Sequence, residues 1–471
     1  MHSSVVIVAF SSLVILSGIS LLFFSADIAL RLLLIGWGQL LLILFALKSP
    51  VMRRTQAILL GYSVILVLIS TFSYYQSIML GTAVEPYLGG SDGQGFFVEA
   101  MIMSEGNILE NIKKFGTNYS GYQVVLASIF DIFGRDLIVG LLLNNTVLLL
   151  VVIFLAKATF LITRDPRATF YASLAFMLTT KFVFYSNTLL KEPFLVLGVA
   201  LLLYAFIQLK IQRHVSLLTY VWIIIAIMIF STMRIPMLVL IPLTGLFILG
   251  RHIFRKTWLF IIIGIFASDL LIVLFSKFTY YEFIRINIYN TVFNNTILSS
   301  SFEGGVDNSG VVGYVMSSYE QLPLLARIVT IPIPVIIQYV LPFNFWSMKF
   351  LEDHFISLFN INLNIIWYLF VGVFAFYTIF NWKRLPNSIL RNTFLIGGMM
   401  YMLIAFVFGG VVPRYASPYL LFIYPTIGYW MSCWSLRSLP TIRLKKFFWL
   451  YYLSFLAAVV AYLFFMMLRF V

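Results

Sequence analysis

The sequence predicts an all-α polytopic membrane protein with about 13 transmembrane helices. Its residues are 62% hydrophobic and only 10% charged, whereas a soluble domain averages about 45–50% apolar and roughly 25% charged residues. Apolar runs near the ~20 residues that a transmembrane helix requires recur along the whole chain. These runs are continuous rather than alternating, which excludes the strand pattern of a membrane barrel.

We interpret residues 1–471 as a single membrane domain that begins with a helical hairpin at 1–50. The first apolar run has no Lys or Arg before it and no small-residue cleavage site, so we expect a retained helix rather than a signal peptide. In chain order the predicted spans are 4–24, 28–47, 56–78, 136–156, 167–186, 190–209, 216–232, 235–250, 257–276, 360–380, 392–411, 417–436 and 447–468.

The distribution of basic residues predicts the orientation of these spans. With a cytoplasmic N-terminus, one set of short loops holds 18 of the 31 basic residues and a single acid, Asp165. The other 13 basic residues share the opposite side with 16 acids. We therefore expect the two long loops, 79–135 and 277–359, to be extracytoplasmic in a multi-pass plasma or inner membrane protein. The 18 residues are Lys48, Arg53, Arg54, Lys157, Arg164, Arg167, Lys210, Arg213, Arg251, Arg255, Lys256, Lys383, Arg384, Arg391, Arg437, Arg443, Lys445 and Lys446.

Both long loops contain apolar segments that we do not interpret as spans. The segment 328–341 carries Pro332 and Pro334, which break an ordinary helix, and a crossing there would reverse the later loops. We interpret it as re-entrant or interfacial, and a spanning segment at 324–341 stays the alternative. Residues 121–134 are too short to span and predict an interfacial helix. Residues 95–114 are amphipathic and predict a second one.

The composition also excludes some functions. The net charge of +14 is spread thinly between apolar spans, which favours contact with anionic lipid rather than nucleic acid. The lone Cys433 excludes a disulfide framework and a thiolate metal cluster. No internal repeat is visible, which weakens a transporter interpretation.

Asp92 is the first candidate for chemistry. Gly89, Gly90, Gly93 and Gly95 surround it and permit a tight turn and a close backbone approach to a ligand. At the outer membrane surface, a partly buried carboxylate can act as a general base on an acceptor hydroxyl. The alternative is an ordinary solvent-exposed turn aspartate.

Cations at the outer ends of spans form the second candidate group. Arginine and lysine at this depth suit a lipid-linked phosphate, and snorkelling to lipid headgroups is the alternative for each of them. We predict phosphate contacts for Lys191, Arg234 and Arg414, with Lys181, Glu192 and Glu99 as supporting candidates. Asp269 inside the ninth span has no assigned role. His354 is the only outer histidine, so neither a histidine metal site nor a Ser-His-Asp triad is expected.

This arrangement resembles the GT-C membrane glycosyltransferases, such as the protein O-mannosyltransferases and the aminoarabinose transferase of lipid A. The resemblance lies in three features: the 91–97 segment Ser-Asp-Gly-Gln-Gly-Phe-Phe, Lys191-Glu192, and Arg414 in Pro-Arg-Tyr-Ala-Ser-Pro. It implies a GT-C-like fold with Asp92 as catalytic base and interfacial helices after it. In the family the large loop follows the first span, whereas here it follows the third, so 1–50 is an added hairpin.

The resemblance implies sugar transfer from a polyprenyl-phosphate carrier to a glycan, lipid or protein acceptor during assembly of surface polysaccharide or glycolipid. Besides the lipid-linked sugar, no cofactor is expected, and a requirement for a divalent metal stays open. The expected partners are membrane lipids, the carrier and the acceptor. Two alternatives stay open: an O-antigen or capsule repeat-unit polymerase, and a lipid-linked oligosaccharide flippase or transporter.

Overall fold

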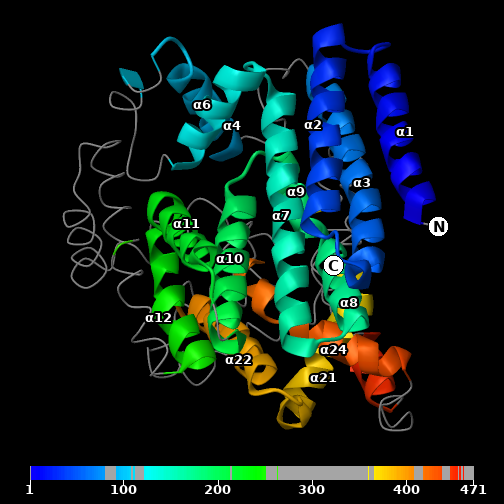
Figure 1. Cartoon of the computed structure of the whole chain (residues 1–471), viewed down its shortest axis with the longest axis vertical. Coiled ribbons are helices and arrows are strands. Elements are labelled where there is room, and N and C mark those ends of the chain that lie inside the picture. Colours follow the sequence, from blue (N-terminus) through cyan, green and yellow to red (C-terminus); the bar gives the residue numbers. More distant parts are fainter. Residues whose placement is uncertain are drawn as a thin grey trace, which may run out of the picture.

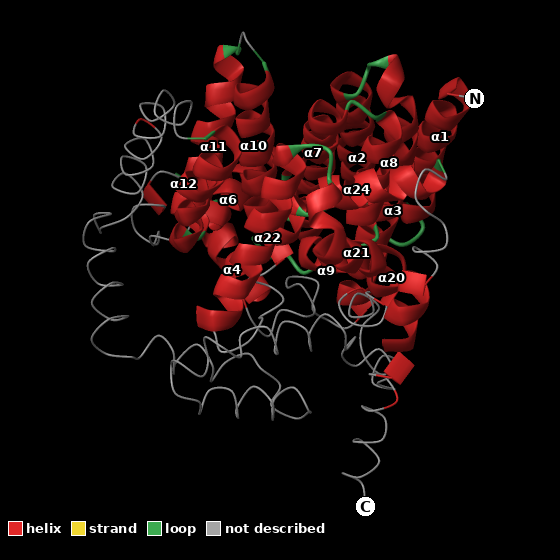
Figure 2. Ribbon diagram, turned by 90° about the horizontal axis from the view of Figure 1, so that it is seen from below, coloured by secondary structure: helices red, strands yellow, loops and turns green. Residues whose placement is uncertain are grey.

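The structure is a computed structural model, and every regular element in the residues that it describes is a helix (Figures 1 and 2). Four of these helices are long and apolar enough to cross a membrane: Ala26–Ala46, Pro50–Met79, Leu137–Thr163 and Glu192–Ile211. The all-helical class is thereby confirmed, and these helices agree with the predicted membrane protein by their length and composition, whereas the total of about 13 spans stays a prediction. The described residues are 2–79, 92–107, 110–111, 121–212, 215–250, 263, 359, 365–407, 417–436, 446–454, 456–457 and 460.

The chain begins with two antiparallel helices that pack on each other and on a third. Ser25 caps the second helix by accepting a hydrogen bond from the Ile28 amide at 3.4 Å, which fixes the turn of the hairpin. The hairpin also contacts the bundle interior, because Gln39 is buried against a later helix. The elements are α1 His2–Ser20, α2 Ala26–Ala46, η1 Pro50–Met52 and α3 Arg53–Met79.

Two shorter helices, α4 Asp92–Met103 and α6 Gly121–Phe133, cross the upper end of the bundle in Figure 1. The second agrees with the predicted helix at 121–134. The first corrects the prediction for 95–114, because α4 begins earlier, at Asp92, and ends at Met103. The chain turns soon afterwards at Gly106, whose φ of 78° suits glycine. The amphipathic pattern of 95–114 therefore extends across this turn, and it does not mark the end of the helix.

The central part of the bundle is formed by α7 Leu137–Thr163, α8 Pro166–Met177, α9 Thr180–Asn187 and α10 Glu192–Ile211. Asp136 caps α7, and Asp165 caps α8, where Pro166 occupies the first turn. The predicted span 167–186 is divided into α8 and α9. At the break, Thr179 lies 2.6 Å from the Tyr424 hydroxyl of a distant helix, a contact that local sequence does not reveal.

Three later predicted spans, 235–250, 360–380 and 417–436, contain turns of 3-10 or π-helix in place of regular α-helix. In 235–250 the departures accompany Pro236 and Pro242, since proline cannot donate a backbone hydrogen bond. The elements are α11 Leu217–Met233, η3 Ile235–Val239, α12 Leu240–Thr244, η4 Gly245–Leu249, α20 Ile365–Trp367, η6 Tyr368–Gly372, α21 Val373–Asn381, η7 Trp382–Arg384, α22 Ser388–Val407, η8 Ser417–Phe422 and α24 Tyr424–Ser435. The span predicted at 257–276, Asp269 within it, and the loop 277–359 with 328–341 and His354 lie outside the described ranges, apart from the isolated residues 263 and 359.

Helix α7 is the centre of the bundle, with α10 on one side and α2 and α3 on the other (Figure 2). Buried amides and hydroxyls join these helices, as is common where helices pack in a membrane. The Gln39 amide nitrogen donates to the Leu142 carbonyl at 3.2 Å and to Thr146 at 3.0 Å, and its oxygen accepts from Ser63 at 3.1 Å. The N-terminal hairpin is thus bonded into the bundle.

The turn between α7 and α8 lies at the end of the bundle opposite α4 and α6 (Figure 1). It carries Arg164 and adjoins Arg167. The Asn387 amide donates to the Ile162 carbonyl at 3.4 Å, which brings the loop with Lys383 and Arg384 to the same end. These four of the basic residues that were predicted to share one side therefore lie at the same end of the bundle.

Candidate functional site

Asp92 is the first residue of α4, and its side chain is exposed. The expectation of a partly buried carboxylate is therefore wrong, and the exposure agrees with the alternative interpretation, although the residue begins a helix. A carboxylate in the first turn of a helix is favoured by the helix dipole. Gly89 and Gly90, which precede Asp92 in the glycine-rich segment, lie outside the described residues. Gly93 and Gly95 lie within α4 and have different surroundings, so these two glycines do not have the same structural role.

Gly93 brings α4 against the loop between α9 and α10. A Cβ atom at Gly93 would lie 2.2 Å from the Thr188 carbonyl oxygen, whereas one at Gly95 would have no neighbour within 4 Å. Only glycine permits this approach without a shift of the backbone. Because the loop leads directly into Lys191, this contact brings the helix of Asp92 to the segment that carries the predicted phosphate ligand.

Lys191 lies at the N-cap of α10 and reaches back to α4. Its ammonium group is 5.5 Å from the centroid of the Phe96 ring, within the range of a cation–π contact. Phe96 in turn packs edge-on against Tyr122 at 5.4 Å, and Tyr122 against Phe194 at 5.5 Å. The Lys191 ammonium group therefore contacts one end of an aromatic cluster that α4, α6 and α10 form together.

The loop before Lys191 is held in an unusual conformation. Leu189 is fully buried and has a φ of 54°, a left-handed value that costs a non-glycine residue about 1–3 kcal/mol. Its side chain packs on Gly140 of α7, where a Cβ would come within 2.6 Å. Asn144, one turn further along α7, donates its amide to the Leu190 carbonyl at 3.0 Å and to the Ser186 carbonyl at 3.4 Å.

The opposite side of Asn144 is bonded to α6. The Tyr122 hydroxyl donates to the Asn144 side-chain oxygen at 3.1 Å. Burial raises the pKa of Tyr122 well above its ordinary value, so the hydroxyl stays protonated and remains a donor. Sequence reasoning missed Asn144, although an Asn-Asn pair inside an apolar span is an unusual feature that could have drawn notice.

Glu192 and Arg234 form an ion pair at 3.1 Å between α10 and the end of α11. The Glu192 side chain has no exposed surface, and that of Arg234 is 16% exposed. A buried carboxylate requires such compensation. Arg234, predicted to contact phosphate, therefore also neutralises the supporting residue Glu192, and the ion pair joins the two helices beside Lys191.

The remaining predicted site residues differ in placement. Glu99 accepts a hydrogen bond from the Gln123 amide at 2.9 Å, which ties α4 to α6. Lys181 is the second residue of α9, about 10 Å along that helix from the 188–191 loop at 1.5 Å per residue. Arg414 lies outside the described residues. The following element, η8, packs against α10.

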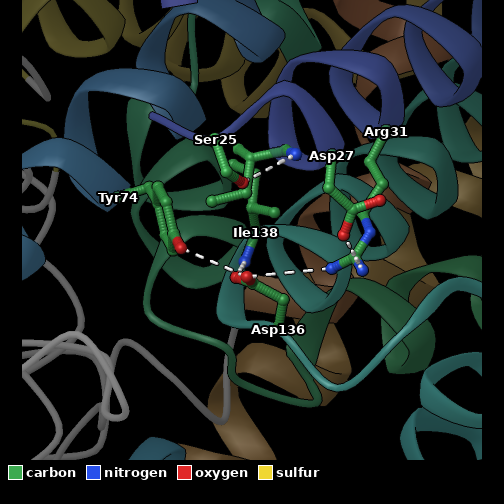
Figure 3. A network of polar contacts seen from close by, with 7 residues as sticks. Ser25, Asp27, Arg31, Tyr74, Asp136 and Ile138 are labelled. Atoms are coloured by element: carbon green, nitrogen blue, oxygen red, sulfur yellow. Dashed lines mark hydrogen bonds and ion pairs between the residues drawn. The ribbon is translucent and has the colours of Figure 1, made fainter. Parts of the chain in front are cut away.

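A second group of charged residues anchors α4 and α6 to the bundle at residues 134–136. Figure 3 shows Asp136 between Tyr74 and Arg31: the Tyr74 hydroxyl donates to Asp136 at 3.2 Å, and the Arg31 guanidinium lies 3.8 Å away. Arg31 also pairs with Asp27. The Arg135 guanidinium donates to the Ser104 carbonyl just after α4. Both ends of α4 are therefore held, one by this turn and one by Thr188.

Within the described residues, no three His, Cys, Asp or Glu side chains are grouped to hold a metal ion. The arrangement instead offers the Asp92 carboxylate at the start of α4, the Lys191 ammonium group close to the same helix, and the Glu192–Arg234 ion pair next to Lys191. Comparison with family models, curated proteins and solved structures found no match to this chain.

Proposed function

We propose that the protein is a membrane glycosyltransferase that moves a sugar from a polyprenyl-phosphate carrier to a glycan, lipid or protein acceptor. The observation that carries this proposal is the contact of Gly93 with Thr188, because it unites the helix of Asp92 with the loop of Lys191. A base and a cation on adjoining elements suit an attack on a phosphate-linked sugar.

In the proposed reaction, Asp92 takes the proton from an acceptor hydroxyl. The hydroxyl oxygen bonds to the anomeric carbon of the sugar as the bond from that carbon to the phosphate oxygen breaks. Polyprenyl phosphate leaves with the electron pair of that bond, and its negative charge develops beside Lys191. In this proposal Arg414 supplies further positive charge, and Arg234, whose charge Glu192 balances, contributes guanidinium N–H donors to the phosphate.

We assign the end that carries α4 and α6 to the extracytoplasmic side. The basic turns that contain Arg164, Arg167, Lys383 and Arg384 lie at the opposite end, and basic loops are retained in the cytoplasm. The site would then act on carriers whose sugar faces outward, in surface-polysaccharide or glycolipid assembly.

The test is sugar transfer in membranes supplied with a radiolabelled polyprenyl-phosphate sugar pool. Asp92→Asn and Lys191→Met should each abolish transfer at normal expression. Asp131→Asn is the matched control, since Asp131 is an exposed carboxylate on α6 away from the site. Full activity of Asp92→Asn would show that Asp92 is not the catalytic base. Transfer of preassembled oligosaccharide blocks would identify a repeat-unit polymerase, and movement of the carrier across the membrane without transfer would identify a flippase.

A further inference from the structure

Asn144 is a fully buried amide in the middle of an apolar helix. A polar group there is costly unless it is hydrogen-bonded, and both polar atoms of this side chain are used. The nitrogen donates to the Leu190 and Ser186 carbonyls, and the oxygen accepts from Tyr122. The side chain therefore bonds the end of α9 and the α9–α10 loop, one on each side of the left-handed residue Leu189.

These two bonds hold a conformation that Leu189 alone does not favour. The φ of 54° at Leu189 reverses the chain between α9 and α10, and the Leu190 amide closes the turn by donating to the Tyr185 carbonyl at 3.1 Å. Without the amide of Asn144, the Leu190 carbonyl would lose its partner at the residue directly before Lys191. The direction in which Lys191 leaves the loop thus depends on a side chain of another helix.

The neighbouring Asn145 provides a contrast. It is equally buried, but its amide donates to the Leu66 carbonyl at 3.1 Å and to Ser70 at 2.7 Å, both on α3. One asparagine of the pair holds the loop, and the other joins two helices. Replacement of either one should weaken the bundle, so a loss of stability alone does not distinguish them.

We infer that Asn144 is a positioning residue that sets the place of the Lys191 ammonium group for a phosphate ligand. The identity of that ligand rests on the proposed function, whereas the positioning of the loop does not. Asn144 itself does not reach the ligand in this inference; it acts through the Leu190 carbonyl and the direction of the chain at Lys191.

Hydrogen exchange tests the positioning without any assay of activity. In full-length protein in lipid nanodiscs, Asn144→Leu should raise exchange over residues 188–195 by about tenfold, since its hydrogen bonds to the Ser186 and Leu190 carbonyls are lost together with the one from Tyr122. Asn145→Leu should leave exchange over this segment near the native rate while lowering thermal stability by a similar amount. Equal exchange in the two variants overturns the inference.

Binding of a short-chain polyprenyl phosphate tests whether Asn144 acts through Lys191. Asn144→Leu should weaken binding about fivefold to tenfold, and Lys191→Met should weaken it further. If Asn144 acts by placing Lys191, the double variant should bind no worse than Lys191→Met alone. Additive losses overturn the inference. If native protein does not bind this probe, the proposed ligand class fails, and the exchange experiment still decides the positioning.

Discussion

Replacement of Gly93 by alanine sets two effects of opposite sign against each other. In an exposed helix, alanine is more favourable than glycine by about 1 kcal/mol. At Gly93, however, the new Cβ would lie 2.2 Å from the Thr188 carbonyl oxygen, whereas such a carbon–oxygen contact normally needs about 3.3 Å. Helix α4 would therefore have to move by roughly 1 Å, and overpacking of this kind costs about 1–3 kcal/mol.

Gly95→Ala is the matched control for this clash. Gly95 lies in the same helix, and its added Cβ would have no neighbour within 4 Å. Both variants gain a similar helix preference, so the difference between them isolates the contact with Thr188. We expect Gly93→Ala to be less stable than Gly95→Ala by about 1–3 kcal/mol.

Two measurements in lipid nanodiscs check this prediction. Thermal unfolding compares the stabilities, and hydrogen exchange over residues 92–103 and 188–195 reports whether α4 has left the loop. In the transfer assay, Gly93→Ala should lose about a hundredfold in rate, because a shift of 1 Å near reacting groups has that effect. If both alanine variants show native exchange and equal stability, α4 does not dock on this loop, and the site as described here is wrong.

Three further predictions concern stability, each measured by thermal unfolding in one detergent. Glu192→Gln should destabilise by about 3 kcal/mol, because it leaves Arg234 without its buried countercharge; a neutral effect would contradict the ion pair. Asp136→Ala should cost about 1–2 kcal/mol through the lost helix cap, whereas Asp27→Ala should change stability by less than ~0.5 kcal/mol, because that carboxylate is 64% exposed. The reverse order would refute the anchoring role of Asp136. Gly61→Ala should be neutral or stabilising by up to about 1 kcal/mol, since nothing lies within 4 Å of its added Cβ, and a loss would show that this face of α3 is packed.

The helical class and the helix at 121–133 could be predicted from the sequence, because burial in a membrane leaves long apolar runs whatever the tertiary contacts are. The turn at Gly106 was not predicted, because the amphipathic pattern of 95–114 continues across it. The break between α8 and α9 had no comparable local signal. It coincides with the bond from Thr179 to Tyr424, which depends on where a distant helix lies.

The candidate site was only partly predictable for the same reason. Lys191 and the Asp92 segment could be assigned to one end of the bundle from charge distribution alone. The pairing of Glu192 with Arg234 depends on how α10 and α11 are rotated against each other, which their nearly uniform apolar sequences do not specify. Leu189 carries no sequence signal for a positive φ, since packing on Gly140 rather than its own preference selects that conformation.

The turn at 134–136 has a consequence for biogenesis. Its partners Arg31 and Tyr74 lie on α2 and α3, which precede Asp136 in the chain and are synthesised before it, and chains fold as they are made. We therefore expect α2 and α3 to form the surface on which Asp136 and the start of α7 dock during assembly. Loss of either partner should then lower the yield of folded protein before it affects the proposed chemistry.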